Sequence, residues 1–144
     1  METILKTDYR KMKPNNDPNN NVVVYYDEVN HWLFVSCANQ PKLKDVKRGF
    51  KQCLDFAARH HCSRLILDGY AVKYTAELLK TSNWLAEKWL PAAERQGLRY
   101  IAQLVPPESG VDQKLFIQPS TPLNIRIESF HSLVNAVKWL YTQQ

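Results

Sequence analysis

Residue types that can bind a metal gather at one place in the sequence. His60, His61 and Cys62 are consecutive, and Cys53 lies about two helical turns before His60. Adjacent side chains at a helix end point in different directions, and no fourth ligand follows at a spacing typical of zinc sites. Structural histidines explain this run better than a metal centre. We therefore expect no metal and no other cofactor.

Covalent catalysis would need a nucleophile with a base and an orienting group beside it. The chain has three cysteines and four histidines, but no GxSxG sequence surrounds any serine. The four glycines are isolated, so no glycine-rich loop is present to hold a phosphate. These features favour a protein that is not an enzyme, and they leave open an enzyme with an arrangement that the sequence does not reveal.

A carboxylate ends the predicted central strand. Asp68 precedes Gly69 at the carboxyl end of that strand, which is the end where open α/β sheets bind ligands. Tyr70, Tyr74 and Thr75 follow and would line the same crevice. The alternative is that Asp68 and Gly69 form a turn that caps the loop.

Four basic side chains repeat at i, i+3, i+4 and i+7 on one face of a predicted helix, namely Lys44, Lys47, Arg48 and Lys51. Cations near a helix N-terminus oppose the macrodipole, so an external anionic partner would explain their position. A solvated face opposite the apolar stripe is the alternative. Aromatic side chains are missing from this face, which disfavours nucleic acid as the partner.

Each of the four tryptophans is followed by leucine, and two of these pairs lie in one predicted helix. Trp84 and Trp89 are five residues apart, which is about 500° around an α-helix. On a regular α-helix the two side chains can therefore hardly face the same core. We expect one to pack on the sheet and the other to lie at the helix edge, against a loop or a second subunit of a homodimer.

The elements that position these residues follow from hydrophobic periodicity. Two β-branched and aromatic runs, 22–26 and 32–37, are joined by a polar turn and predict a β-hairpin. The later elements are a helix over 43–60, a buried strand over 64–69, a helix over 75–96, a strand over 100–105, a short helix over 112–117, a strand over 123–127 and a helix over 129–141.

Local signals set the predicted boundaries of the helices. Ser82 is placed to act as a cap inside the long helix, Pro91 either kinks it or begins its last segment, and Gly97 caps its end. Ser129 or Ser132 would cap the last helix. The buried stripe of the first helix comprises Val46, Phe50, Cys53, Leu54 and Ala57.

This order predicts a single α/β domain with a mixed sheet of about five strands, an N-terminal hairpin and covering helices. Residues 1–21 are rich in asparagine and proline and read as a flexible arm or edge segment, whereas 22–144 form the domain. A length of 144 residues suits one domain, and 44% hydrophobic and 23% charged residues are ordinary for a globular protein.

The composition also bears on membrane insertion and on the cellular compartment of the protein. No run approaches the roughly 18 apolar residues that span a bilayer, and the first residues do not resemble a secretory signal, so we expect no membrane insertion. Three cysteines are an odd number without a CxxC pair, which favours free thiols in the cytoplasm. The net charge of +5 allows weak attraction to anionic partners.

The chain between residues 22 and 141 resembles a group of small bacterial proteins with a STAS-like (sulfate transporter and anti-sigma antagonist) or SpoIIAA-like fold. The landmarks that carry the resemblance are Asp68, Trp84, Trp89-Leu90-Pro91, Gly97, Ala102, Phe130, Ala136 and Trp139-Leu140. The resemblance implies a non-enzymatic module that binds partners. In members with a phosphorylation switch, Asp-Ser-(Ser/Thr)-Gly follows the central strand, but here Asp68-Gly69-Tyr70 stands in that place and Thr75 is the nearest hydroxyl.

The expected function is therefore a non-catalytic cytoplasmic protein-interaction or regulatory module with a protein partner, and homodimerisation is a further expectation. The alternative is a small-ligand or lipid-binding domain, or an undetected enzyme, that uses the crevice near Asp68. The two differ in structure, because a ligand-binding domain needs a closed pocket and an interaction module needs a filled core with an exposed patch.

Overall fold

The computed structural model describes residues 21–72, 76–106, 117, 119 and 122–143 of the chain. Its strands form one five-stranded sheet in the order β1-β2-β3-β4-β5. The α/β class, the single domain and the mixed sheet of five strands are confirmed. The predicted arm over 1–21, apart from Asn21, and the predicted short helix over 112–117, apart from Ile117, lie outside the described residues.

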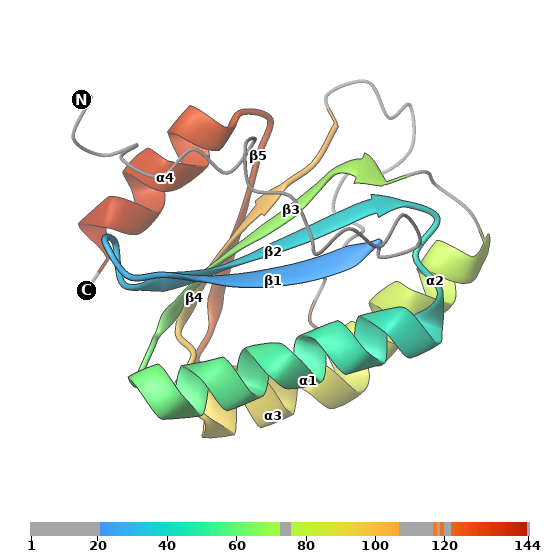
Figure 1. Cartoon of the computed structure of the whole chain (residues 1–144), viewed down its shortest axis with the longest axis horizontal. Helices are drawn as coiled ribbons and strands as arrows, with labels where there is room; N and C mark the ends of the chain where they lie inside the picture. The colour runs from blue at the N-terminus through green and yellow to red at the C-terminus, as the bar shows by residue number, and fades with distance from the viewer. Residues whose placement is uncertain (1–20, 73–75, 107–116, 118, 120–121, 144) are drawn as a thin grey trace.

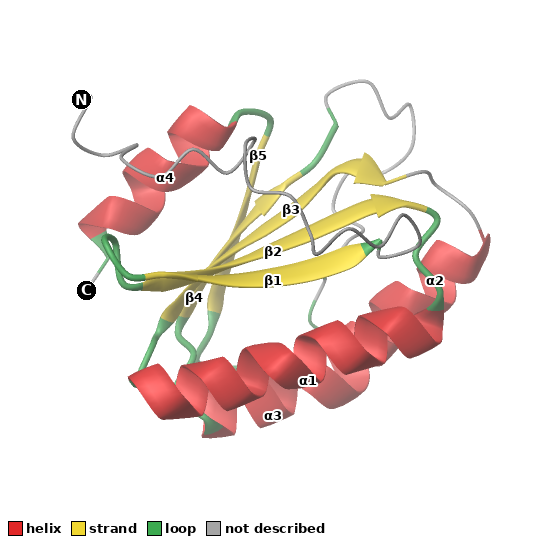
Figure 2. Cartoon of the chain, viewed as in Figure 1, coloured by secondary structure: helices red, strands yellow, loops and turns green. Residues whose placement is uncertain are grey.

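The first two strands form the predicted hairpin, and the other pairs are parallel (Figures 1 and 2). The strands are β1 (Val22–Asp27), β2 (Trp32–Asn39), β3 (Arg64–Val72), β4 (Tyr100–Leu104) and β5 (Arg126–Phe130). The helices are α1 (Leu43–His60), α2 (Ala76–Trp84), the π-helix η3 (Leu85–Trp89), α3 (Leu90–Arg95) and α4 (Leu133–Thr142).

Helices cover both faces of the sheet. Helix α1 packs on β1 and β2, with α2, η3 and α3 beside it on the same side, whereas α4 packs on β3, β4 and β5 from the other side (Figure 1). We refer to these two sides of the sheet as the α1 face and the α4 face.

Helix α1 agrees with its prediction at both ends, and four of the five predicted stripe residues are buried while Leu54 is half-buried. Gly49 joins the buried side because β1 passes very close to it. A Cβ atom at Gly49 would lie 2.5 Å from Cγ1 of Val22. The glycine therefore sets how closely α1 approaches the sheet.

The central strand β3 is buried on both faces, as its lack of alternation predicts, because Leu65, Ile66 and Leu67 are fully buried. The predicted end of this strand at Asp68-Gly69 is wrong, since β3 continues to Val72. The strand continues through Asp68-Gly69 because its pairing with β2 is irregular there. The register shifts between Ser36 and Ala38 of β2.

The predicted strand over 123–127 is also shifted, because β5 begins at Arg126 and ends at Phe130. Ile125 is buried and Leu123 is half-buried, so the alternation that predicted the strand reflects packing of the segment before it. Helix α4 begins at Leu133, where the Ser132 hydroxyl accepts a hydrogen bond from the Asn135 amide at 3.1 Å. Of the two predicted caps, Ser132 is the observed one.

The long helical stretch breaks at a different place from the one predicted. Ser82 lies inside α2 and is 8% exposed, so its prediction as an internal cap is wrong. The break is η3, where the Leu90 amide donates to the Leu85 carbonyl, an i→i+5 bond. Pro91 occupies the first turn of α3, and Gly97 has the positive φ of 99° expected at a helix end.

One arginine joins three parts of the chain at the same end of the sheet. The Arg64 guanidinium donates to the Asn30 carbonyl in the hairpin turn at 2.7 Å, and to the carbonyls of Leu140 and Gln143 at the end of α4 at 3.3 and 3.2 Å. It also lies 5.1 Å from the ring of the fully buried Trp32. Carbonyls at a helix C-terminus lack the donors of a further turn, and the guanidinium supplies one to Gln143 and a second one to Leu140, which also accepts from the Gln143 amide.

Replacement of Arg64 should therefore weaken the whole domain. We expect Arg64→Ala to lower the free energy of unfolding by about 2–4 kcal/mol, because several part-buried carbonyls lose a charged donor and the Trp32 ring loses its contact with the guanidinium. Urea denaturation followed by circular dichroism measures this change. Arg99→Ala is the matched control, since among the described residues the Arg99 side chain donates to the nearby carbonyls of Glu94 and Leu98 alone, and the change should cost less than about 1 kcal/mol. Equal losses in the two variants would contradict the joining role of Arg64.

Candidate functional site

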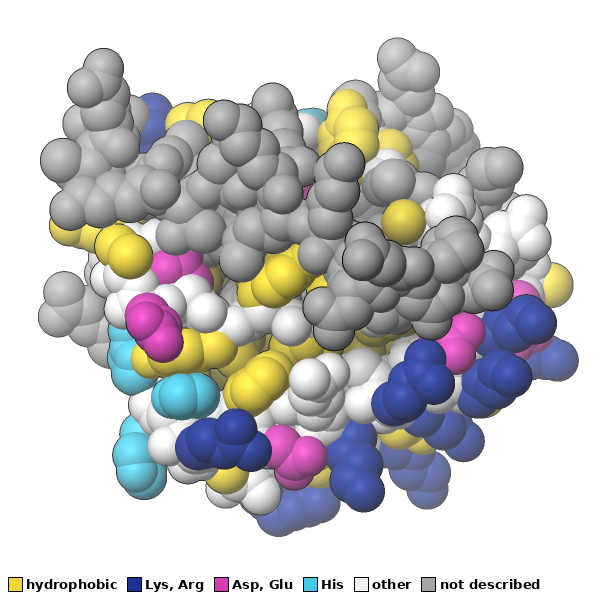
Figure 3. Space-filling model, viewed as in Figure 1, with side chains coloured by type: hydrophobic (Ala, Val, Ile, Leu, Met, Phe, Trp, Pro, Cys, Tyr) yellow, Lys and Arg dark blue, Asp and Glu magenta, His cyan; other side chains and the backbone are white. Residues whose placement is uncertain are grey.

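The four basic residues predicted to share a helix face do so on the N-terminal half of α1. All four side chains are exposed, and we call Lys44, Lys47, Arg48 and Lys51 the basic surface. Lysine and arginine side chains gather over α1 and α2 in the space-filling view (Figure 3). Exposed Lys80 of α2 and Lys88 of η3 add to the positive charge of this side of the molecule.

Contacts within the domain neutralise little of this charge. Arg48 pairs with Asp45 at 3.1 Å, but its side chain remains 70% exposed, so the pair adds little to stability. Within the described residues, no ion pair holds Lys44 or Lys51. The residue before the first turn of α1, Lys42, makes no capping hydrogen bond with its side chain. Of these charges only Lys44 lies in the first turn of α1, where the helix dipole disfavours a cation, and Asp45 in the same turn offsets part of that cost.

The π-helix changes how Trp84 and Trp89 lie relative to each other. A turn closed from i to i+5 brings residues five apart to nearly the same side, whereas the 500° estimate assumed a regular α-helix. Trp89 is 2% exposed, its Nε1 donates to the Phe50 carbonyl at 2.8 Å, and its ring meets the Phe50 ring edge-on at 4.9 Å. Trp89 is therefore a core residue that fixes η3 against α1, and its prediction as part of a partner surface is wrong.

Trp84 also lies against α1, one turn closer to its N-terminus. Its side chain is half-buried, and the Lys47 ammonium lies 5.8 Å from the centre of its ring. The structure thus places an aromatic side chain beside the basic surface, which the sequence of α1 alone could not show. The five-residue spacing of Trp84 and Trp89 was the available signal, since that spacing matches one π-turn.

The predicted crevice is only partly within the described residues, because Tyr74 and Thr75 lie outside them. An oxygen of Asp68 accepts a hydrogen bond from the Tyr70 amide at 3.0 Å inside β3, where the pairing with β2 is irregular, so the alternative of a turn that caps a loop is wrong as well. Tyr70 is 48% exposed. The described strand order rises steadily from β1 to β5, so this sheet has no reversal of the kind that opens a ligand crevice.

The histidines near the end of α1 each make a structural contact. His60 stacks on Tyr26 with ring centres 3.8 Å apart, and the Tyr26 hydroxyl in turn bonds to Nδ1 of His31. His61 adopts the left-handed conformation that ends α1, and the Cys62 amide donates to the Ala57 carbonyl. Over the described part of the chain, no cluster of three or more His, Cys, Asp or Glu could hold a metal ion.

The three cysteines are free thiols buried in the core. Burial raises the pKa of Cys37 and of Cys53 well above the usual range for a thiol, and nearby Asp68 adds to the effect at Cys37. Burial also raises the pKa of Cys62. A thiol acts as a nucleophile in its ionised form. These environments keep the thiols protonated and suit a packing role.

Comparisons with protein-family models, with curated proteins and with solved structures find no match for the chain. Across the residues that the structure describes, no helix is both long and apolar enough to cross a membrane.

The buried thiols make stability depend on pH in a defined direction. Their raised pKa values keep them protonated when folded, while the unfolded chain loses these protons above about pH 9, so the unfolded state binds fewer protons there. We expect full stability below pH 9 and a loss of up to about 1.4 kcal/mol per pH unit for each thiol above it.

Urea denaturation between about pH 8 and pH 10 measures this dependence. The Cys37→Ala/Cys53→Ala variant should show a shallower decline with pH than the wild-type protein, whatever its stability at neutral pH. Parallel declines would show that the thiols are not responsible.

Proposed function

We propose that this chain is a non-catalytic cytoplasmic interaction or regulatory module that binds an acidic segment of a protein partner on its basic surface. The observation that carries the proposal is the row of exposed cations on α1 beside the half-buried Trp84. An apolar ring next to unneutralised charges is a combination that protein interfaces use, with the aromatic as anchor and the charges to orient the partner.

The position of the charges supports an external anion. Lys44 lies in the first turn of α1 and Lys51 two turns later, and within the described residues neither is held by an ion pair. A partner carboxylate near Lys44 would interact favourably with its ammonium and with the N-terminal end of the helix, whereas Lys51 would contribute through its charge alone. Binding would then remove a cost that the free domain carries.

One feature favours a protein segment over a nucleic acid. Asp45 lies among the cations and pairs with Arg48. A carboxylate at that point would repel a continuous phosphate backbone, whereas separate acidic side chains can be spaced to avoid it.

The cytoplasmic setting is supported by the chemistry of the cysteines, because three buried free thiols suit a reducing compartment. The proposed STAS/SpoIIAA-like family is supported by the opening hairpin, the parallel strands that follow and the landmark residues. Trp89, Leu90 and Leu140 are core residues of this domain. In that group of proteins a module acts through its partners, which agrees with the proposed role.

A small-ligand or lipid-binding domain, or an enzyme, remains the second candidate because of one buried hydroxyl. The Tyr25 hydroxyl is buried and has no hydrogen-bond partner among the described residues, and Tyr25 lies on the α4 face of the sheet, as Asp68 does. A polar ligand group would satisfy it. Native mass spectrometry of the protein purified from its own host should detect such a ligand, and its absence there would count against this candidate.

Selection from a random displayed peptide library tests the leading proposal. We expect the wild-type protein to enrich peptides with several spaced acidic residues, and we expect Lys44→Glu/Lys51→Glu to bind those peptides about tenfold more weakly. The control variant Lys138→Glu/Arg95→Glu changes the net charge equally on exposed residues of α4 and α3 and should bind as the wild type does.

Three results would contradict the proposal. The library would yield no acidic peptides, or the two variants would weaken binding equally, or a single-stranded oligonucleotide would bind more tightly than the best peptide and depend on the same two lysines. The last result would assign the basic surface to a nucleic acid.

A further inference from the structure

The fifth strand has one edge that no described strand occupies. Strand β5 pairs with β4 alone, and β1 forms the opposite end of the sheet. An exposed edge offers unpaired amides and carbonyls to another chain, and proteins either block such an edge or use it.

The hydrogen bonds of β5 show which backbone groups face outward. The Arg126 amide donates to the Arg99 carbonyl, and the Phe130 carbonyl accepts from the Val105 amide, both at 2.9 Å. Residues along a strand alternate in the direction of their backbone groups, so 126, 128 and 130 face β4. The amides and carbonyls of Ile127 and Ser129 therefore point away from the sheet.

We propose that two copies of this chain associate through antiparallel pairing of β5 with β5, about a two-fold axis at Ile127. In this register Ile127 of each copy lies opposite the same residue of the other and exchanges amide-to-carbonyl bonds with it. Ser129 lies opposite Ile125 and uses the next outward groups. The register thus engages the groups that β4 leaves free, and the contact is self-complementary as a two-fold interface must be.

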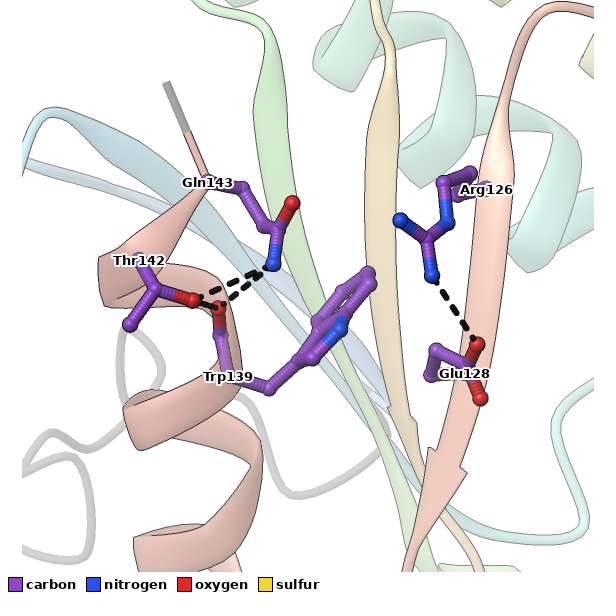
Figure 4. A network of polar contacts seen from close by, with 5 residues as sticks. All are labelled: Arg126, Glu128, Trp139, Thr142 and Gln143. Carbon is purple, nitrogen blue, oxygen red and sulfur yellow. Dashed lines mark hydrogen bonds and ion pairs between the residues drawn. The ribbon is translucent and has the colours of Figure 1, made fainter.

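The side chains fit this register through their charges. Arg126 of one copy lies opposite Glu128 of the other, and the symmetry makes this contact twice. These residues form a non-hydrogen-bonded pair, in which facing side chains come closest in an antiparallel ladder. Both side chains project from β5 on the α4 face, where they lie near Trp139 and pair with each other at 3.7 Å (Figure 4).

The charges also exclude neighbouring registers. A two-fold axis at residue 126 would place arginine opposite arginine, and an axis at residue 128 would place glutamate opposite glutamate. Arg126 and Glu128 are 64% and 48% exposed, so both are accessible to a second copy. Attraction in one register with repulsion in the adjacent ones is how a sheet edge selects a specific partner.

Exchange of charges tests the interface, independently of the basic surface and its proposed partner. Sedimentation velocity should show a concentration-dependent dimer for the wild type. Arg126→Glu and Glu128→Arg should each raise the dimer dissociation constant at least about tenfold, because each variant places like charges opposite one another. An equimolar mixture of the two variants should restore the dimer, since an arginine pair in one chain then meets a glutamate pair in the other.

Controls separate the interface from general effects. Lys138→Glu changes an exposed charge on α4 and should leave dimerisation intact. Thermal unfolding of each variant at low concentration checks that the monomer folds. A wild-type protein that stays monomeric at several hundred micromolar would overturn the proposal. Variants that dimerise as the wild type does, or a mixture that stays monomeric while both variants are folded, would overturn it as well.

Discussion

The fold depends on how the carbonyl groups at one end of the sheet are satisfied. The hairpin turn and the last turn of α4 both present carbonyls there, and the Arg64 guanidinium reaches both from the first residue of β3. Asp27 completes the same turn from the other side, because its carboxylate accepts from the amides of Val29 and Asn30. The amides of this turn thus donate to a carboxylate, and its Asn30 carbonyl accepts from a guanidinium. Trp32 is fully buried beside this junction, which gives the guanidinium an apolar surface to lie on.

A second polar contact positions the edge strand. Gln103 of β4 is 2% exposed, and its side-chain amide exchanges two hydrogen bonds with the backbone of Ile117 at 3.1 and 3.2 Å. Its Nε2 also donates to the Ser129 hydroxyl on β5 at 3.0 Å. A buried amide with every group paired is favourable, whereas the same amide unpaired would be costly. Gln103 therefore holds Ile117 beside β4 and links β4 to β5 through the Ser129 side chain.

How well the sequence predicts an element depends on whether contacts within that element or contacts with distant segments determine its ends. Helix α1 was predicted to its last residue because its apolar stripe and its basic face both recur within the helix itself. Strand β5 was misplaced because its ends are set by pairing with β4, and no local pattern encodes that register. The basic surface was visible in the sequence for the same local reason as α1. Its aromatic neighbour Trp84 was not, because a π-turn in a different helix brings it there.

The two proposed surfaces are compatible because they lie at opposite ends of the sheet. Helix α1 covers β1 and β2, whereas the proposed pairing uses the free edge of β5. Facing residues in an antiparallel pair project to the same side, so the proposed two-fold axis runs perpendicular to the sheet and keeps both α1 faces on one side. A dimer built in this way would present two copies of the basic surface in the same direction, separated by the width of the joined sheet. A partner with two acidic segments would then bind its second site at a high effective concentration, and modest affinity at each site would be enough for stable association.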